Sequence, residues 1–109
     1  MNRKWILAVL LGAGISLMAV AAPADDYVIT EKDKKFSPEV LTIPAGQKVK
    51  VTVKNLDSTT AEFESGDFDR EKVVNANSEI TVFLGPVDAG TYNYVDDFHR
   101  ETIGKIVAK

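Results

Sequence analysis

The sequence predicts an all-β protein, an antiparallel β-sandwich of seven or eight short strands. Short apolar or alternating segments recur along the chain from about residue 27 onward. Turn-forming Gly, Pro, Asn and Asp residues separate these segments, and no long segment has the 3.6-residue period of an amphipathic helix. Many short strands with frequent turn signals are typical of β-sandwiches.

The first 24 residues have the features of a secretory signal peptide. Arg3 and Lys4 give a positive start, residues 5–20 form an apolar run, and small residues follow. The run of 16 residues is shorter than the roughly 20 needed to cross a bilayer. We therefore expect cleavage after Ala24, or alternatively after Ala21, and no membrane span in the exported protein. An uncleaved anchor is the alternative reading.

The exported part, residues 25–109, is expected to be one domain of 85 residues. It has a net charge of −5, no cysteine, and no methionine once Met1 and Met18 leave with the signal peptide. These features exclude disulfide bonds, thiolate metal sites and cysteine nucleophiles. An acidic chain without a basic stripe is also not expected to bind nucleic acid.

The strands follow from local patterns. The clearest is 48–54, where Val49, Val51 and Val53 alternate with polar residues and so share one face. The other expected strands are 27–30, 40–43, 60–64, 72–74, 79–84, 91–95 and 103–108. Turn or loop residues separate them at 44–47, 55–58, 65–69, 85–86 and 88–90.

Acidic residues gather in two segments, and the first runs from Glu62 to Glu71. If 60–64 is a strand, Phe63 points into the core while Glu62 and Glu64 point the other way. Residues two apart on a strand are roughly 7 Å apart, so these two carboxylates could reach one cation. The alternative is that both simply face solvent.

The second acidic segment, 96–101, contains His99, the single histidine of the chain. A lone histidine is often a surface or hydrogen-bonded residue, but Asp96 and Asp97 beside it offer a mixed ligand set. Carboxylates with imidazole suit iron, manganese or oxidised copper, and carboxylates alone suit calcium, although no EF-hand pattern is present. No G-x-S-x-G motif supports a hydrolase.

The order of the motifs resembles that of the cupredoxins. These motifs are F-S-P at 36–38, L-T-I-P-A-G at 41–46, an alternating strand ending at Asn55, G-T-Y-N-Y-V at 90–95 and G-K-I-V at 104–107. The resemblance implies a Greek-key sandwich. It also places Asp96 where blue copper proteins have their cysteine ligand, and His99 where they have a histidine. Ala61 and Glu62 replace the upstream histidine, and no axial methionine exists, so a blue copper site is excluded.

A narrower resemblance is to the EfeO-type cupredoxin-like domains of bacterial iron uptake. It rests on A-E-F-E-S at 61–65, E-K-V-V at 71–74, the segment from Gly85-Pro86 to Tyr94, and D-F-H at 97–99. The resemblance implies a site for copper or iron near one end of the sandwich, where both acidic segments would meet. The ligands that it implies are Glu62, Glu64, Asp96 and His99, with Glu71 and Asp97 as secondary candidates.

Three functions are compatible with this reading. The first is a periplasmic metal-binding protein that assists iron transport by passing its ion to a membrane iron permease or a periplasmic iron-binding protein. The second is copper-dependent oxidation of ferrous iron, for which one histidine is a sparse ligand set. The third is a metal-free adapter that docks on a permease through its acidic loops and exposed Phe68 and Phe98.

Overall fold

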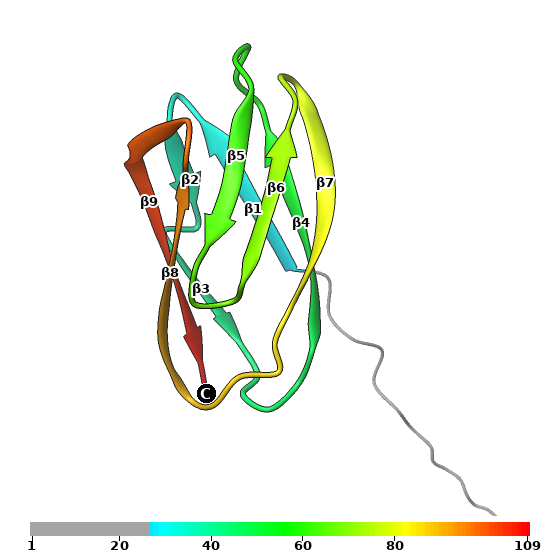
Figure 1. The fold of residues 1–109 in the computed structure, drawn as a ribbon, viewed down its shortest axis with the longest axis vertical. Helices are drawn as coiled ribbons and strands as arrows, with labels where there is room; N and C mark the ends of the chain where they lie inside the picture. The colour runs from blue at the N-terminus through cyan, green and yellow to red at the C-terminus, as the bar shows by residue number, and fades with distance from the viewer. Residues whose placement is uncertain (1–26) are drawn as a thin grey trace, which may run out of the picture.

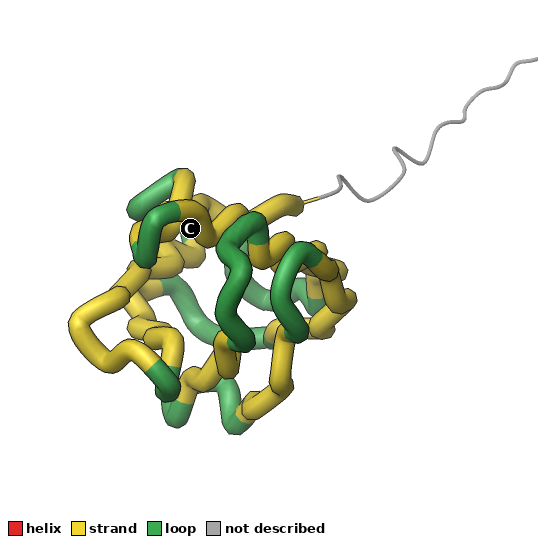
Figure 2. The backbone as a smooth tube through the Cα atoms, turned by 90° about the horizontal axis from the view of Figure 1, so that it is seen from above, coloured by secondary structure: helices red, strands yellow, loops and turns green. Residues whose placement is uncertain are grey.

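The computed structural model describes residues 27–109, which form two β-sheets packed face to face (Figures 1 and 2). The four-stranded sheet has the order β2 (Lys35–Ser37), β1 (Tyr27–Lys32), β4 (Val49–Asn55), β7 (Ser78–Leu84). The five-stranded sheet has the order β3 (Val40–Ile43), β9 (His99–Ala108), β8 (Gly90–Asp96), β5 (Ala61–Ser65), β6 (Arg70–Val74). The expected signal peptide and its cleavage sites lie outside the described residues.

The prediction of an all-β sandwich is confirmed, with nine strands among the described residues instead of seven or eight. The additional strand is β2, whose three residues are too few to show an alternating pattern. It follows a tight turn in which Asp33 and Lys34 have positive φ angles of 53° and 60°. These angles suit the two-residue turn of a hairpin, so β1 and β2 pair although the sequence there carries no glycine.

Both sheets are mixed and not wholly antiparallel as predicted, because β1 pairs with β4 and β3 pairs with β9 in parallel. The remaining strand pairs are antiparallel. Strand direction depends on how the chain crosses between the sheets after β2 and β3, which local periodicity does not encode. No helix of the described residues is long and apolar enough to cross a membrane.

The core lies between the two sheets and follows from strand alternation. Val49, Val51 and Val53 of β4 are buried, as predicted, and so is Phe63 of β5. The phenol ring of Tyr94 packs against two aromatic rings, with centroid distances of 4.7 Å to Phe36 and 5.2 Å to Phe63. These rings come from β2, β5 and β8, and all three strands reach the upper half of the sandwich in Figure 1.

Candidate metal centre

The five-stranded sheet separates the four principal site residues predicted from the sequence. In the register of β5 with β8, Phe63 lies opposite Asp96, so the Asp96 side chain faces the core as Phe63 does. Glu62 and Glu64 alternate with Phe63 and lie on the outer face of the same sheet. Asp96 and His99 therefore belong to an inner group, and the two glutamates belong to an outer one.

The inner group consists of Glu31, Asp96 and His99, whose potential ligand atoms all lie within 4.8 Å of one another. Glu31 comes from β1 of one sheet, while Asp96 ends β8 and His99 begins β9 in the other. Glu31 and Asp96 are 3% and 0% exposed, whereas the His99 side chain is 24% exposed. The group is thus buried on its carboxylate side and reaches solvent at the imidazole.

Asp96 is the most heavily hydrogen-bonded member of this group. Its Oδ1 accepts hydrogen bonds from the backbone N–H groups of Glu62 (2.9 Å) and Phe98 (3.0 Å), and its Oδ2 lies 2.7 Å from Nδ1 of His99. Burial by itself raises its pKa, but hydrogen bonds from Glu31, Glu62, His99 and Phe98 together hold the pKa of Asp96 below its ordinary value. Asp96 is therefore an anion in the core.

Glu31 has the opposite character. Burial raises the pKa of its carboxyl group to about 8, helped by its hydrogen bond to Asp96 and by the negative charges of Asp96 and Asp57, while Lys34 opposes the rise. At neutral pH Glu31 therefore holds a proton and donates it to Asp96. A buried acid held neutral beside a charged partner is a common sign of a functional site.

The sequence interpretation did not include Glu31 among the candidate ligands. One signal was present just beyond the predicted strand 27–30. If that strand continues by one residue, Glu31 shares a face with Ile29, and the apolar Ile29 marks that face as the core side. A glutamate on the core side of a strand is unusual unless it is paired.

The hydroxyl group of Tyr94 lies in the core without a hydrogen-bond partner. Tyr94 is 1% exposed, and its pKa lies above the ordinary value, first because of burial and then because of the nearby charge of Glu31. Tyr94 precedes Asp96 by two residues on β8, so both side chains point into the core.

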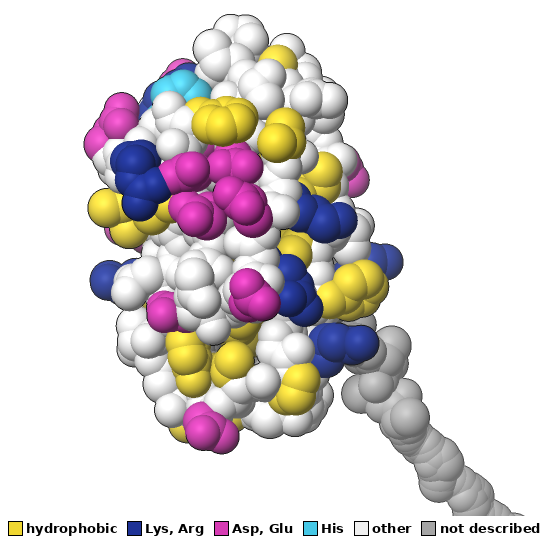
Figure 3. Space-filling model, in the orientation of Figure 1, with side chains coloured by type: hydrophobic (Ala, Val, Ile, Leu, Met, Phe, Trp, Pro, Cys, Tyr) yellow, Lys and Arg dark blue, Asp and Glu magenta, His cyan; other side chains and the backbone are white. Residues whose placement is uncertain are grey.

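The outer group consists of Glu62, Glu71 and Asp97, whose carboxylate oxygens also lie within 4.8 Å of one another. Figure 3 shows a cluster of acidic side chains on one face of the molecule. Partial burial, followed by repulsion from Glu71 and Glu64, raises the pKa of Glu62. The sequence expectation that the two acidic segments meet is confirmed for this group, whereas Asp67 and Asp69 lie in the turn at the far end of β5 and β6.

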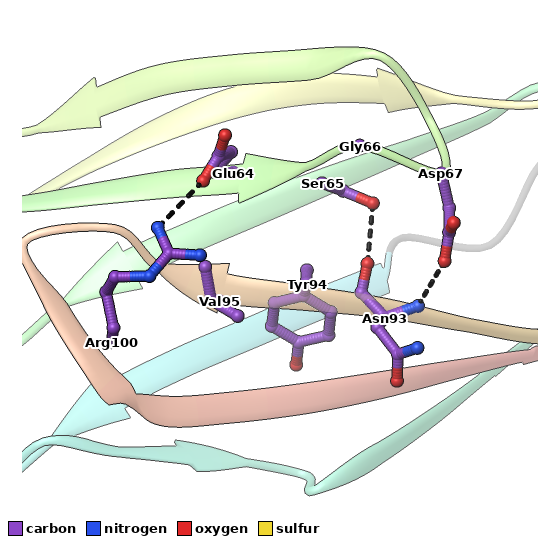
Figure 4. A pocket seen from close by; sticks show the side chains of 8 residues that line it. All are labelled: Glu64, Ser65, Gly66, Asp67, Asn93, Tyr94, Val95 and Arg100. Atoms are coloured by element: carbon purple, nitrogen blue, oxygen red, sulfur yellow. Dashed lines mark hydrogen bonds and ion pairs between the residues drawn. The ribbon is translucent and has the colours of Figure 1, made fainter.

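Glu64 has a different partner on the outer face. Its carboxylate lies 3.5 Å from the guanidinium of Arg100, which also pairs with Asp97. Beside this ion pair, β5 and β8 diverge and leave an open groove of about 330 Å³ (Figure 4). The groove is bridged by hydrogen bonds from Ser65 Oγ to the Asn93 carbonyl (2.6 Å) and from the Asn93 N–H to Asp67 (2.9 Å).

The two phenylalanines expected on an exposed docking surface behave differently. Phe98 is 50% exposed, as expected, but Phe68 is only 7% exposed. The Phe68 ring packs on Tyr92 at a centroid distance of 5.2 Å and belongs to the hydrophobic core. The expectation that Phe68 is exposed is wrong, and an adapter surface of this composition loses one of its apolar residues.

The sandwich, with its acid and imidazole side chains gathered at the end where β8 turns into β9, defines a protein of the cupredoxin class. The chain belongs to the family of cupredoxin-like domains, whose sequence model matches residues 5–108. An uncharacterised protein of Rickettsia prowazekii, RP394, is 40% identical over 74 residues, which are 68% of this chain. The chain spans 59% of the length of that relative.

Solved structures show the same fold at low sequence identity. Auracyanin A, a blue copper protein of Chloroflexus aurantiacus, is 20% identical with a TM-score of 0.64, over 79% of this chain and 99% of that one. Amicyanin of Paracoccus versutus is 20% identical with a TM-score of 0.63, over 81% and 85% of the two chains. The metal-binding domain of the Cu(I)-exporting ATPase CopA of Streptococcus pneumoniae is 10% identical with a TM-score of 0.72, over 84% and 91%.

The side chains present in this protein do not fit a blue copper centre, since the sequence contains no cysteine for the thiolate bond. The inner group instead offers two carboxylates and one imidazole. Such oxygen and nitrogen donors suit Cu(II), iron or manganese. The unpaired Tyr94 hydroxyl adds one more polar group in the same part of the core.

Proposed function

We propose that this protein is an exported, periplasmic metal-binding protein that holds an iron or copper ion through Glu31, Asp96 and His99. The observation that carries the proposal is the burial of two carboxyl groups in contact with each other and with the single histidine. Burying two acids together destabilises a fold unless a proton or a cation compensates their charge. A cation in this place would compensate both carboxylates at once.

The chemistry of the group suits reversible binding. Asp96 is already ionised, and two backbone N–H groups hold its Oδ1 in place, so its Oδ2 could bind a metal that replaces its contact with His99. Glu31 would exchange its proton for the metal, and metal affinity would therefore rise with pH. The partly exposed His99 gives the ion a path from solvent.

The proposed role is to assist iron transport by delivering the ion to a membrane iron permease or to another periplasmic iron-binding protein. It is supported by the resemblance to EfeO-type domains and by the signal-like start of the sequence. Glu62, Glu71 and Asp97 lie on the outer side of the five-stranded sheet, and Glu64 lies beside them against Arg100. We assign these carboxylates a secondary role as a weaker, more exposed place for the same cation.

Copper-dependent oxidation of ferrous iron is a second candidate, favoured by one observation. The inner and outer groups are connected, because the Asp97 N–H donates to the Glu62 carbonyl (2.8 Å) and the Glu62 N–H donates to Asp96. A copper ion inside and an iron ion outside would thus lie on opposite sides of one strand pair. Fe(II) would give one electron to bound Cu(II), and dissolved oxygen would reoxidise the resulting Cu(I). Faster oxygen-dependent loss of Fe(II) with the copper-loaded protein than with the metal-free protein would establish this function.

The test is thermal unfolding and calorimetric titration with EDTA, Cu(II), Fe(II) without oxygen, chelated Fe(III), Mn(II) or Ca(II). We expect a rise in Tm with copper or iron that is lost in E31Q/H99A, because a ligand that binds only the folded state stabilises it. The matched control is E62Q/E71Q, which removes the same number of groups from the outer face and should retain most of the shift.

Two results would contradict the proposal. Identical unfolding curves for every ion would show that the protein binds none of them, and would favour the metal-free adapter function. Loss of the shift in E62Q/E71Q but not in E31Q/H99A would move the site to the outer face.

A further inference from the structure

The Tyr94 hydroxyl is the single buried side-chain nitrogen or oxygen atom of residues 27–109 that has no hydrogen-bond partner. Such an atom destabilises the folded protein, since its hydrogen bonds to water are lost on folding and not replaced. Phenylalanine would fill the same space without this cost, and Phe36 and Phe63 show that the neighbouring positions use it. The hydroxyl therefore needs a reason other than packing.

The Tyr94 ring packs against two phenylalanine rings, and each of these lies opposite one of the two buried acids. Phe36 lies opposite Glu31 in the register of β1 with β2, and Phe63 lies opposite Asp96 in the register of β5 with β8. Tyr94 contacts both rings, at 4.7 and 5.2 Å between centroids. Each acid is thus the cross-strand neighbour of a phenylalanine whose ring contacts Tyr94.

The residue opposite Tyr94 on β9 is a glycine, and its lack of a side chain leaves space for the phenol ring and its hydroxyl. Gly104 pairs with Tyr94, and a Cβ atom at Gly104 would overlap the phenol carbons and the hydroxyl oxygen. The φ angle of Gly104 is not in the left-handed region, so this glycine is required by the ring rather than by the backbone. The ring is consequently fixed from three sides, and its hydroxyl has little freedom to reach other partners.

We propose that Tyr94 is a positioning residue for the metal, and that its hydroxyl donates a hydrogen bond to Glu31 when a cation is bound. This inference rests on the proposed function. Glu31 is buried, and its potential ligand atom lies within 4.8 Å of those of Asp96 and His99. A metal bound by one oxygen of Glu31 leaves the other oxygen as a buried acceptor. The unpaired Tyr94 hydroxyl is available in this part of the core to donate a hydrogen bond to that second oxygen.

Partners behind the direct ligands orient them, and their removal weakens metal binding by about 10- to 100-fold. We therefore expect Tyr94→Phe to weaken binding of the preferred ion, copper or iron, by that factor. The same variant should leave the Tm of the metal-free protein unchanged or higher, because it removes an unpaired buried hydroxyl. If Tyr94 had only a packing role, Tyr94→Phe would not weaken metal binding while leaving the Tm of the metal-free protein unchanged or higher.

The experiment titrates wild type, Y94F and Y92F with the ion that stabilises wild type most, and records the metal-free Tm of each. Y92F is the matched control, because the Tyr92 hydroxyl donates to the Asp88 carbonyl at 2.7 Å, at the other end of β8. Equal affinities of wild type and Y94F would overturn the role of Tyr94 and leave the proposed function standing. Absence of binding to wild type would overturn both.

A second measurement does not depend on the folding of Y94F. Formation of a hydrogen bond from a tyrosine hydroxyl to a carboxylate shifts the near-ultraviolet absorption of that tyrosine to longer wavelength. Metal added to wild type should produce this difference spectrum, and metal added to E31Q should not. A wild type that binds metal without any tyrosine difference signal would also overturn the inference.

Discussion

Glu31 and Asp96 come from opposite sheets of the sandwich, and their carboxyl groups share one proton in the core. Burial raises the pKa of both acids, but their partners differ. Hydrogen bonds from Glu31, from two backbone N–H groups and from His99 lower the pKa of Asp96 overall, whereas the hydrogen bond to Asp96 and its charge raise the pKa of Glu31 further. One acid is thereby fixed as the anion and the other as the proton donor.

This pair predicts an unusual dependence of stability on pH. The pKa of Glu31 rises from 4.5 to about 8 on folding, so between these values the folded protein keeps a proton that the unfolded chain has released. Stability must then fall as pH rises through this window, by up to about 1.4 kcal/mol per pH unit. Urea unfolding of the metal-free protein at pH 5, 6, 7 and 8 measures the slope.

Below about pH 4 the stability should change with pH in the opposite direction. The pKa values of Asp57 and Asp96 are lowered in the folded protein, so their contribution is lost as pH falls below about 4. Maximum stability is therefore expected near pH 5. Stability that rises steadily from pH 5 to pH 8 would contradict the assignment of a neutral Glu31.

Replacing Glu31 by glutamine should separate stability from metal binding. The amide of the new side chain would donate to Asp96 without a titrating proton, so E31Q should flatten the slope between pH 5 and 8 and be more stable than wild type at pH 8. It should also lose the Tm shift caused by metal, since an amide is a poorer ligand than a carboxylate. E39Q, which changes an exposed glutamate, is the control and should change neither property.

Gly104→Ala should destabilise the fold strongly although the substitution is small. The new Cβ would overlap the Tyr94 ring, and overpacking of this kind costs about 1–3 kcal/mol. Gly66→Ala is the control, because nothing lies within 4 Å of its Cβ position. In the double variant G104A/Y94L the smaller side chain at position 94 should recover part of the lost stability. If urea unfolding instead shows that the double variant loses the sum of the two single-variant losses, the contact between these positions is contradicted.

Much of the fold was predictable because alternating residues are a local signal. The valines of β4 and Phe63 of β5 are buried as their spacing indicates. The division of the site was not predictable, because it depends on the register that places Asp96 opposite Phe63, across 33 residues of chain. Two acids can be near in space and still lie on opposite faces of a sheet, as Asp96 and Glu62 do.

The omission of Glu31 from the sequence interpretation has a related explanation. Glu31 belongs to a strand that ends in Thr30, Glu31 and Lys32, and such polar endings are usually solvent-exposed. Its burial depends on β2 folding back beside β1, and β2 is itself too short to predict. His99 and Asp96 were candidates because their motif resembles a known loop, whereas Glu31 has no motif around it.

Asn55→Ala should cost about 2–4 kcal/mol, more than a typical single substitution, because several buried groups lose their partners together. The Asn55 amide donates to the carbonyls of Thr59 (2.8 Å) and Val74 (3.1 Å), and its oxygen accepts from the Asp57 N–H (3.0 Å). Asp57 in turn accepts from the N–H groups of the turn between β1 and β2, at 2.6 and 3.0 Å.

The loss should therefore spread from Asn55 to the strand that carries Glu31. Hydrogen exchange of the 33–34 turn and of β1 should accelerate in N55A, while exchange in β9 should change little. The exposed Asn75, changed to alanine, is the control and should cost less than about 0.5 kcal/mol. Acceleration confined to residues 56–60 would show that Asn55 stabilises only its own loop and does not support the position of Glu31.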